Sequence, residues 1–330
     1  MNQINPMFNV KAVYIYSDLP SYVRVNKTLP ILRDMFREVH YIGVTRKKQL
    51  DSSRTEGIHY HIDDRRLGNG MQTIFGILGF IRYIREVLKE VKPEVVIAVN
   101  EEYILPFTFG YLPMPKYLVL DLYDSIAMRI SGPARLINPL WRWLSELAMR
   151  TVHALVEVAE ERLAWHRHPP KISKVIYNSP FYIENITVRE NLPEKFIYVN
   201  GMLLDGMHGV ETILTAVEKT PGMSIVFSGW VKGKFLEEKF LTHPKVVNLG
   251  LVNPTEIPGI IKASSGVWAH YNPVKINYIY GAPNKLYDAM MVGRPVFLNS
   301  ENHACSLAQK HGFGIISAYG DVHSLSLIHI

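Results

Sequence analysis

The 330-residue chain is predicted to be an α/β protein built from two Rossmann-like domains. Apolar segments of strand length alternate with helical stretches, which indicates parallel sheets covered by helices on both faces. The length corresponds to two domains at roughly 150 residues each. The two halves show a similar pattern, and a mostly polar stretch, Thr187–Pro193, separates them. We therefore expect an N-terminal domain at residues 1–190 and a C-terminal domain at residues 191–330.

The first half is expected to contain seven strands and three long helices. Apolar runs of strand length predict the strands, and longer amphipathic stretches predict the helices. The expected strands are Lys11–Tyr16, Val39–Val44, His59–Ile62, Val95–Val99, Tyr117–Asp121, Ala154–Val158 and Val175–Tyr177. The expected helices are Val25–Arg37, Met71–Val91 and Pro139–Arg150.

The second half repeats the alternation. The expected strands are Phe196–Asn200, Ser224–Ser228, Val246–Leu249, Gly266–Tyr271, Val296–Leu298 and Gly314–Ile316. The expected helices are Gly209–Lys219, Lys234–Leu241, Pro254–Ala263, Asn284–Met291 and Ala304–His311. The run that ends at Tyr271 leads into a loop on the carboxyl side of the sheet, where doubly wound folds bind their ligands.

Composition favours a cytoplasmic protein. A single cysteine, Cys305, excludes an internal disulfide and fits a reducing compartment. The stretch Met1–Val10 has neither the basic start nor the apolar block of a secretory signal. The longest apolar run, Ile74–Ile81, is too short to cross a bilayer, which takes about 20 residues.

The net charge of +6 is unevenly distributed. Residues 1–190 hold 25 basic and 20 acidic side chains, and residues 191–330 hold 11 and 10. A basic first half suits an anionic lipid or a phosphorylated acceptor, and a merely solvated surface is an equally open interpretation. The cluster Trp141–Trp143 suits a membrane interface, at the inner face of the membrane, although a core-facing helix explains it as well. Nucleic-acid binding is not expected, because no basic run exceeds Arg46–Lys48.

The most informative segment is Gly281–Asn299, which is expected to form a loop, a helix and a buried strand. Pro283 suits the start of a helix, because the amide that it lacks would have no partner there. The amides of Asn284, Lys285 and Leu286 then point out of the helix end and favour an anion, to which Lys285 adds a positive charge. Asp288 lies one turn deeper on the same face, where its carboxylate can accept hydrogen bonds from sugar hydroxyls.

This segment closely resembles the donor-site helix of GT-B glycosyltransferases of the family 4 type. The common form there is Pro-(Ser/Asn)-Lys-Leu-(Tyr/Phe)-Glu, followed after a few residues by Gly-(Lys/Arg)-Pro-Val. This chain has matching residues at Pro283–Asp288 and at Gly293–Val296. The alternative interpretation is an amphipathic core helix whose lysine and aspartate are merely solvated.

The resemblance implies two Rossmann-like domains that face each other across a cleft. It also implies that Asp288 grips the ribose of a nucleotide-diphosphate sugar and that Asn284–Leu286 cradle its phosphates. Gly201 and Gly229, each at the end of an expected strand, would allow the donor to approach closely. The family implies transfer with retention, and the chain lacks a strand-borne Asp-x-Asp metal motif. We therefore expect no metal and no cofactor, with the nucleotide sugar as substrate.

Several positions depart from the family pattern. Many members carry a carboxylate where this chain has Tyr280, which can donate a hydrogen bond but cannot act as a carboxylate. A basic pair of the family is replaced by Met202 and His208, and His208 could substitute for a lysine only when it is protonated. Lys232, in the loop after Gly229, is an alternative phosphate partner, although a solvated loop lysine is the commoner case.

The N-terminal domain is expected to bind the acceptor. Related enzymes often have a histidine in an Asp-x-His-Asp-like run, and Tyr123 holds that place here, followed by Asp124. Tyr123 and Asp124 are therefore candidates to contact the transferred sugar or the acceptor. Glu101, in an acidic loop after a strand, either binds acceptor hydroxyls or supplies a base, or it only caps the following segment. His59, His61 and Asp63 alternate on one strand face, but a polar strand face explains them better than a metal site does.

These observations predict a glycosyltransferase that moves a sugar from a nucleotide-diphosphate donor to a glycan or lipid-linked acceptor. Two alternatives stay open, namely a catalytically inactive nucleotide-sugar-binding protein and a sugar-nucleotide epimerase of the same fold. The segment after Gly314–Ile316 is shorter than in the family, so a C-terminally truncated chain is expected.

Overall fold

The computed structural model describes residues 6–18, 23–44, 54–64, 71–129, 136–180 and 183–325. Contacts divide the chain into two compact units, Met1–Ile176 and Tyr177–Ile330. The division lies before the polar stretch at which the sequence placed it. The reason is that the segment after Ile176 packs on the second unit, where Asn178 Nδ2 donates to Ala282 O at 3.0 Å and Arg189 pairs with Glu256 at 2.9 Å.

The described part of unit 1 forms a seven-stranded parallel sheet in the order β3-β2-β1-β4-β5-β6-β7. Its strands are β1 (Phe8–Ile15), β2 (Phe36–Val44), β3 (Ile58–Asp63), β4 (Val95–Val99), β5 (Tyr117–Asp121), β6 (Ala154–Glu157) and β7 (Ile172–Val175). Its helices are α1 (Val23–Met35), α2 (Met71–Val91), α3 (Leu105–Thr108), α4 (Ile126–Arg129), α5 (Asn138–Thr151) and α6 (Glu160–Trp165), and η1 (Glu101–Tyr103) is a single 3₁₀ turn.

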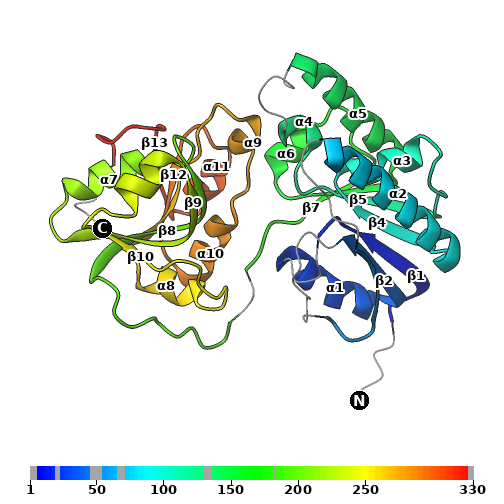
Figure 1. Ribbon diagram of the computed structural model, residues 1–330, viewed down its shortest axis with the longest axis horizontal. Coiled ribbons are helices and arrows are strands. Elements are labelled where there is room, and N and C mark those ends of the chain that lie inside the picture. Colours follow the sequence, from blue (N-terminus) through cyan, green and yellow to red (C-terminus); the bar gives the residue numbers. More distant parts are fainter. Residues whose placement is uncertain are drawn as a thin grey trace. The chain divides into compact units, whose positions relative to one another are not determined.

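Helices cover both faces of this sheet (Figure 1). Helix α1 packs on one face through Val25, Leu29 and Leu32. Helices α2, α3 and α5 pack on the other, where α2 contributes Phe80 and Ile84. The strands are buried on both faces, which explains why they appear in the sequence as continuous apolar runs.

The described part of unit 2 forms a six-stranded parallel sheet in the order β10-β9-β8-β11-β12-β13. Its strands are β8 (Lys195–Leu204), β9 (Met223–Lys232), β10 (Val246–Asn248), β11 (Gly266–Ala269), β12 (Val296–Asn299) and β13 (Gly314–Ser317). Its helices are α7 (Val210–Glu218), α8 (Ile257–Ala263), α9 (Ile276–Ile279), α10 (Asn284–Val292) and α11 (Cys305–Lys310), with one π-type turn, η3 (Leu236–Phe240).

The sheet of unit 2 is also covered on both sides (Figure 1). Helix α7 and η3 pack on one face, and α8, α10 and α11 pack on the other. The strand order reverses between β8 and β11, and in unit 1 it reverses between β1 and β4. The carboxyl ends of strands at such a reversal form the crevice in which doubly wound folds bind ligands.

The expected α/β class with two Rossmann-like domains is thus confirmed. The differences concern details. Strand β7 begins three residues earlier than expected, and β8 and β9 each continue four residues beyond Asn200 and Ser228, where the sequence placed their ends. No helix in the described part of the chain is both long and apolar enough to cross a membrane.

Candidate functional site

The site in unit 2 is organised by the start of helix α10. Pro283 stands at its N-cap with φ −67° and ψ 130°, and the helix ends at Gly293, whose φ of 69° is left-handed. Leu286 and Ala289 turn one face of the helix into the core. Because the first turn lacks a preceding one, the amides of Asn284 and Lys285 have no helical carbonyl to bind. The amide of Leu286 already bonds to Pro283 O at 3.0 Å.

Lys285 turns from this helix onto the sheet. Its Nζ donates to the backbone oxygen of Asn200 at 3.0 Å and lies 5.6 Å from the centre of the Tyr271 ring. Burial lowers the pKa of Lys285 to about 8, and the nearby carboxylate of Asp288 opposes part of that shift. The ammonium is therefore still mostly protonated at pH 7, and it is desolvated beside Asn200, four residues before the end of β8.

Gly201 and Gly229 face each other across β8 and β9, directly after Asn200. Both have positive φ angles, 95° and 137°. A Cβ at Gly229 would overlap the backbone oxygen of Gly201. Only glycine fits here, so backbone is exposed at the point where the sequence expected a donor to approach.

His208 follows β8 and lies in the same crevice, with its ring centre 5.7 Å from those of Tyr271 and Tyr278. Burial, with a smaller contribution from Lys285, lowers the pKa of His208 to about 4. Its Nδ1 accepts the amide of Leu204 at 3.0 Å, so the neutral ring carries its proton on Nε2. At pH 7 the neutral ring therefore cannot supply the positive charge that His208 would need in order to replace the lysine of the family pattern.

The remaining donor-side candidates lie apart from the contact between Lys285 and Asn200. Tyr280 ends α9 and stacks on His303, with ring centres 4.5 Å apart. Lys232 is exposed at the end of β9, where it pairs with Leu204. The structure thus brings Gly201, Gly229, His208, Lys285 and Asp288 together around the crevice, whereas the stacking of Tyr280 and the strand pairing of Lys232 involve other residues.

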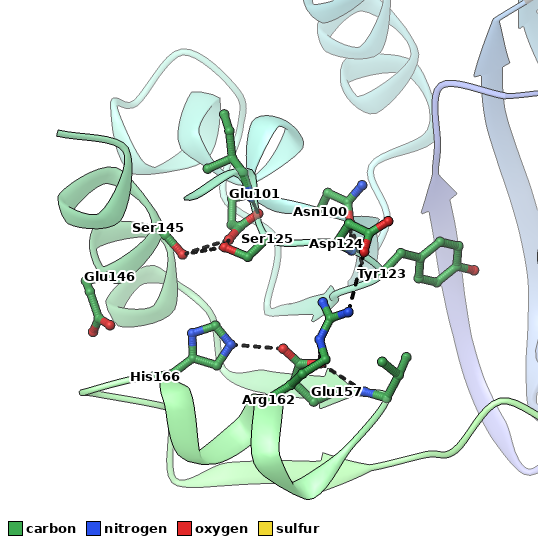
Figure 2. Close-up of polar contacts among 12 residues, drawn as sticks. Asn100, Glu101, Tyr123, Asp124, Ser125, Ser145, Glu146, Glu157, Arg162 and His166 are labelled. Carbon is green, nitrogen blue, oxygen red and sulfur yellow. Dashed lines mark hydrogen bonds and ion pairs between the residues drawn. The ribbon is translucent and has the colours of Figure 1, made fainter. Parts of the chain in front are cut away.

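In unit 1, Glu101 is fully buried after β4 (Figure 2). Its carboxylate accepts hydrogen bonds from Ser125 Oγ and Ser145 Oγ, each at 2.7 Å, and from the amide of Ile126 at 3.0 Å. The last of these satisfies an amide in the first turn of α4. Of the two interpretations that the sequence left open for Glu101, this geometry favours the capping role.

Asp124 follows β5 and belongs to a chain of charges that the sequence did not reveal. Arg162, which is 2% exposed, lies between two carboxylates (Figure 2). Its Nε is 3.1 Å from Glu157 and its Nη1 is 3.4 Å from Asp124. Glu157 in turn binds His166 Nε2 at 2.9 Å. Asp124 is 44% exposed whereas Arg162 and Glu157 are buried, so among these linked charged groups the carboxylate of Asp124 is the one that a ligand can reach.

Tyr123 is 7% exposed and belongs to an aromatic group at the same edge of the sheet. Its hydroxyl lies 2.6 Å from that of Tyr14, and the Arg24 guanidinium stands 3.7 Å over its ring. Tyr14 also donates to Asp121, whose pKa is raised by burial. These contacts fix the ring in the unit 1 crevice.

Asn100 holds Tyr123 and Asp124 in place. Its backbone combines a positive φ of 67° with an extended ψ of 161°, a region that residues other than glycine rarely adopt, and its side-chain oxygen accepts the amides of both residues at 3.0 Å. Nothing in the sequence indicated this role. Arg162 was equally hidden, because it lies 38 positions from Asp124.

The strand that carries His59 and His61 holds a polar cluster of a different kind. His40 Nδ1 lies 2.9 Å from His61 Nε2, and His40 Nε2 lies 2.8 Å from Glu38. Among the described residues no group of three His, Cys, Asp or Glu side chains is arranged to hold a metal ion.

No family model and no curated protein matches the chain. Solved structures do. Sucrose-phosphate synthase from Thermosynechococcus elongatus is 10% identical, with a TM-score of 0.71 over 96% of this chain and 87% of that one. HepE of Anabaena, in complex with UDP and glucose, is 15% identical, with a TM-score of 0.65 over 97% and 89%. UDP-GlcNAc 2-epimerase from Methanocaldococcus jannaschii is 13% identical, with a TM-score of 0.53 over 96% and 90%. This likeness and the two parallel sheets show that the chain has the GT-B fold.

Proposed function

We propose that the protein is a glycosyltransferase of the family 4 type, which transfers a sugar from a nucleotide-diphosphate donor. The observation that carries the proposal is the start of α10. There Lys285 is held against Asn200, beside the backbone of Gly201, with Asp288 one turn deeper on the same helix. A cation, helix amides and a carboxylate in this order match the phosphates and the ribose of a nucleotide.

Each group then has a role. The amides of Asn284 and Lys285, with the Lys285 ammonium, would bind the diphosphate, and Asp288 would accept the ribose hydroxyls. Gly201 and Gly229 would let the donor lie against the backbone. As the glycosidic bond breaks, the helix end and Lys285 would stabilise the charge that develops on the leaving diphosphate. The proposed reaction proceeds with retention and uses neither a metal nor a cofactor.

The acceptor would bind to unit 1, at the carboxyl ends of its strands. Asp124 is the partly exposed carboxylate there, and the Tyr123 ring is fixed beside it. We propose a growing glycan or a lipid-linked sugar as acceptor, and a cytoplasmic location with peripheral contact to anionic membrane. Three exposed apolar side chains support that contact, Leu136 just before α5 and Leu140 and Trp143 in its first two turns. Failure of anionic liposomes to retain the protein in a sedimentation assay would remove it.

The fold by itself leaves the reaction open, because solved structures described as a galactosyltransferase, a glycosyltransferase and an epimerase share it. The neutral His208 and the apolar Met202 favour a second candidate, a protein that binds the nucleotide sugar without catalysis. The two candidates and the epimerase differ in their products. A transferase releases a nucleoside diphosphate, an epimerase returns a changed sugar on the same nucleotide, and a binding protein does neither.

The test is a calorimetric screen of UDP, GDP, ADP and their common sugars against the wild type and Asp288→Ala. We expect one nucleoside diphosphate to bind, with a loss of at least tenfold in affinity in the variant. Release of that diphosphate from its sugar conjugate, in the presence of acceptor mixtures, would establish the transferase. Binding without release would favour the non-catalytic candidate. Absence of binding to the wild type would overturn the proposed donor site.

A further inference from the structure

Strands β8 and β9 do not end at their paired glycines. They continue in register to Leu204 and Lys232, and the first pair beyond the glycines is Met202 with Trp230. Both side chains are large and apolar, and they are 45% and 49% exposed. A single exposed apolar side chain is ordinary, but two that are paired at the edge of a ligand crevice form a continuous apolar surface.

The face on which this pair lies follows from strand alternation. Side chains at Tyr198, Asn200 and Met202 share one face, since successive residues of a strand point to opposite sides. Tyr198 packs with Leu286 and Tyr287 of α10, whereas Leu203 and Val231 pack into the core on the opposite face. Met202 and Trp230 therefore lie on the face that α10 covers.

The order along this face matches the order along a donor. Asp288 acts electrostatically on Tyr198, and Lys285 bonds to Asn200, two residues further along β8. Met202 and its partner Trp230 lie two residues beyond Asn200 and its partner, and each such step of two residues spans about 7 Å along the strand. The pair therefore lies beyond the first residue of α10. Ribose, phosphates and sugar follow one another in the same order in a nucleotide sugar.

We propose that Trp230, supported by Met202, is the platform on which the transferred sugar of the donor lies. This inference rests on the proposed function. An indole face binds a pyranose through the C–H groups on one side of the ring, because that contact removes apolar surface of both partners from water. The pair thus selects a hexopyranose that presents an uninterrupted C–H face.

The experiment compares a nucleoside diphosphate with its sugar conjugate, so that the two ligands share the nucleotide and one of them lacks the sugar. UDP with UDP-glucose, GDP with GDP-mannose and ADP with ADP-glucose are titrated calorimetrically into the wild type, Trp230→Ala and Met202→Ala. For the pair that binds, Trp230→Ala is expected to weaken the sugar conjugate at least tenfold and the diphosphate less than twofold. Met202→Ala should show a smaller loss in the same direction. Unchanged circular-dichroism melting verifies that the variants fold.

Fluorescence gives a second readout and a matched control. Trp143 is 56% exposed on α5 of unit 1. Addition of the sugar conjugate should change the tryptophan emission of Trp143→Leu as it does that of the wild type, and should leave the emission of Trp230→Leu unchanged.

Three results would overturn the inference. An equal loss for both ligands in Trp230→Ala would place the indole on the nucleotide, and no loss for either would place the sugar elsewhere. Absence of diphosphate binding by the wild type would overturn the proposed function itself and this inference with it, and it is distinguishable because it appears before any variant is made.

Discussion

The Nζ of Lys285 donates a hydrogen bond of 3.0 Å to the backbone oxygen of Asn200, in the strand β8 that borders the crevice of unit 2. The ammonium has three N–H donors, of which one is paired with this protein oxygen, and burial keeps water from the other two. A buried ammonium with unpaired donors lowers the stability of the folded protein, and it binds an anion strongly because its donors are already free of water. Two measurable properties of the proposed donor site, its stability without ligand and its affinity for an anion, follow from the burial of this charge.

Replacing Lys285 by Met should stabilise the protein without ligand and abolish nucleotide binding. The folded-state pKa of about 8 lies below the unfolded value near 10.4, so the charged form opposes folding at pH 7. After a discount for partial exposure, the gain is on the order of 1–2 kcal/mol in the free energy of unfolding. Denaturant unfolding and calorimetry measure both effects. Lys262→Met, at an exposed position on α8, is the control and should change neither.

The affinity for a nucleoside diphosphate should fall as pH rises through 8. Lys285 loses its proton there, whereas the diphosphate is already fully ionised. Above the pKa, each further pH unit lowers the fraction of protein with a charged Lys285 about tenfold, so the fall in affinity approaches tenfold per pH unit. Calorimetric titrations between pH 7 and 9.5 measure it. A flat profile over that range would show that the lysine does not bind the phosphates.

The parts of the proposed donor site whose structure depends on local chemistry could be predicted from the sequence. Pro283 and Gly293 delimit α10 because one lacks an amide and the other tolerates a left-handed backbone. Contacts between distant segments could not be predicted. The glycines at 201 and 229 suggested strand ends, yet they pair with each other and allow the ladder to continue.

In unit 1, the short helices α4 and α6 are under two turns long and show no periodicity. The Arg162 chain joins residues that only the fold brings together, so no spacing in the sequence indicates it. The general plan was therefore predictable, whereas the polar contacts that organise unit 1 were not.

The glycine pair gives a stability prediction with an internal control. Gly229→Ala should destabilise the protein by more than about 2 kcal/mol, because it combines a left-handed backbone with overlap on Gly201. Gly222 has a φ of 73° and no atom within 4 Å of an added Cβ. Gly222→Ala should therefore lose only the backbone contribution, about 1 kcal/mol. Equal losses in urea unfolding would mean that β8 and β9 are not tightly packed at this point.

Substitution of Glu101 should lower the stability of unit 1, whereas substitution of Asp124 should lower transfer activity with little effect on stability. Glu101→Ala leaves two hydroxyls and one amide without their acceptor in the core, and should cost on the order of 3 kcal/mol of stability. Asp124→Asn should change stability by less than about 1 kcal/mol, because its carboxylate is 44% exposed and its ion pair is long. Transfer activity should nevertheless fall at least tenfold in Asp124→Asn. A stable Glu101→Ala variant without activity would reverse the assignment and make Glu101 the chemical group.

Unit 2 should lose stability as pH falls from about 6.5 to 4, because two of its histidines are buried in the neutral form. Burial lowers the pKa of His270 to about 3 and that of His208 to about 4. Both values lie below the unfolded value near 6.5, so in this window the unfolded chain binds more protons and acid favours unfolding. The stabilisation is complete above pH 6.5, and for each histidine the loss is on the order of 2–3 kcal/mol by pH 4.

His270 stacks on Trp268 with ring centres 3.9 Å apart, a contact that phenylalanine can preserve. In differential scanning calorimetry, His270→Phe should therefore keep the neutral-pH stability of the wild type and lose less of it at pH 4. If the variant and the wild type lose the same amount, His270 is not the group through which acid unfolds the unit.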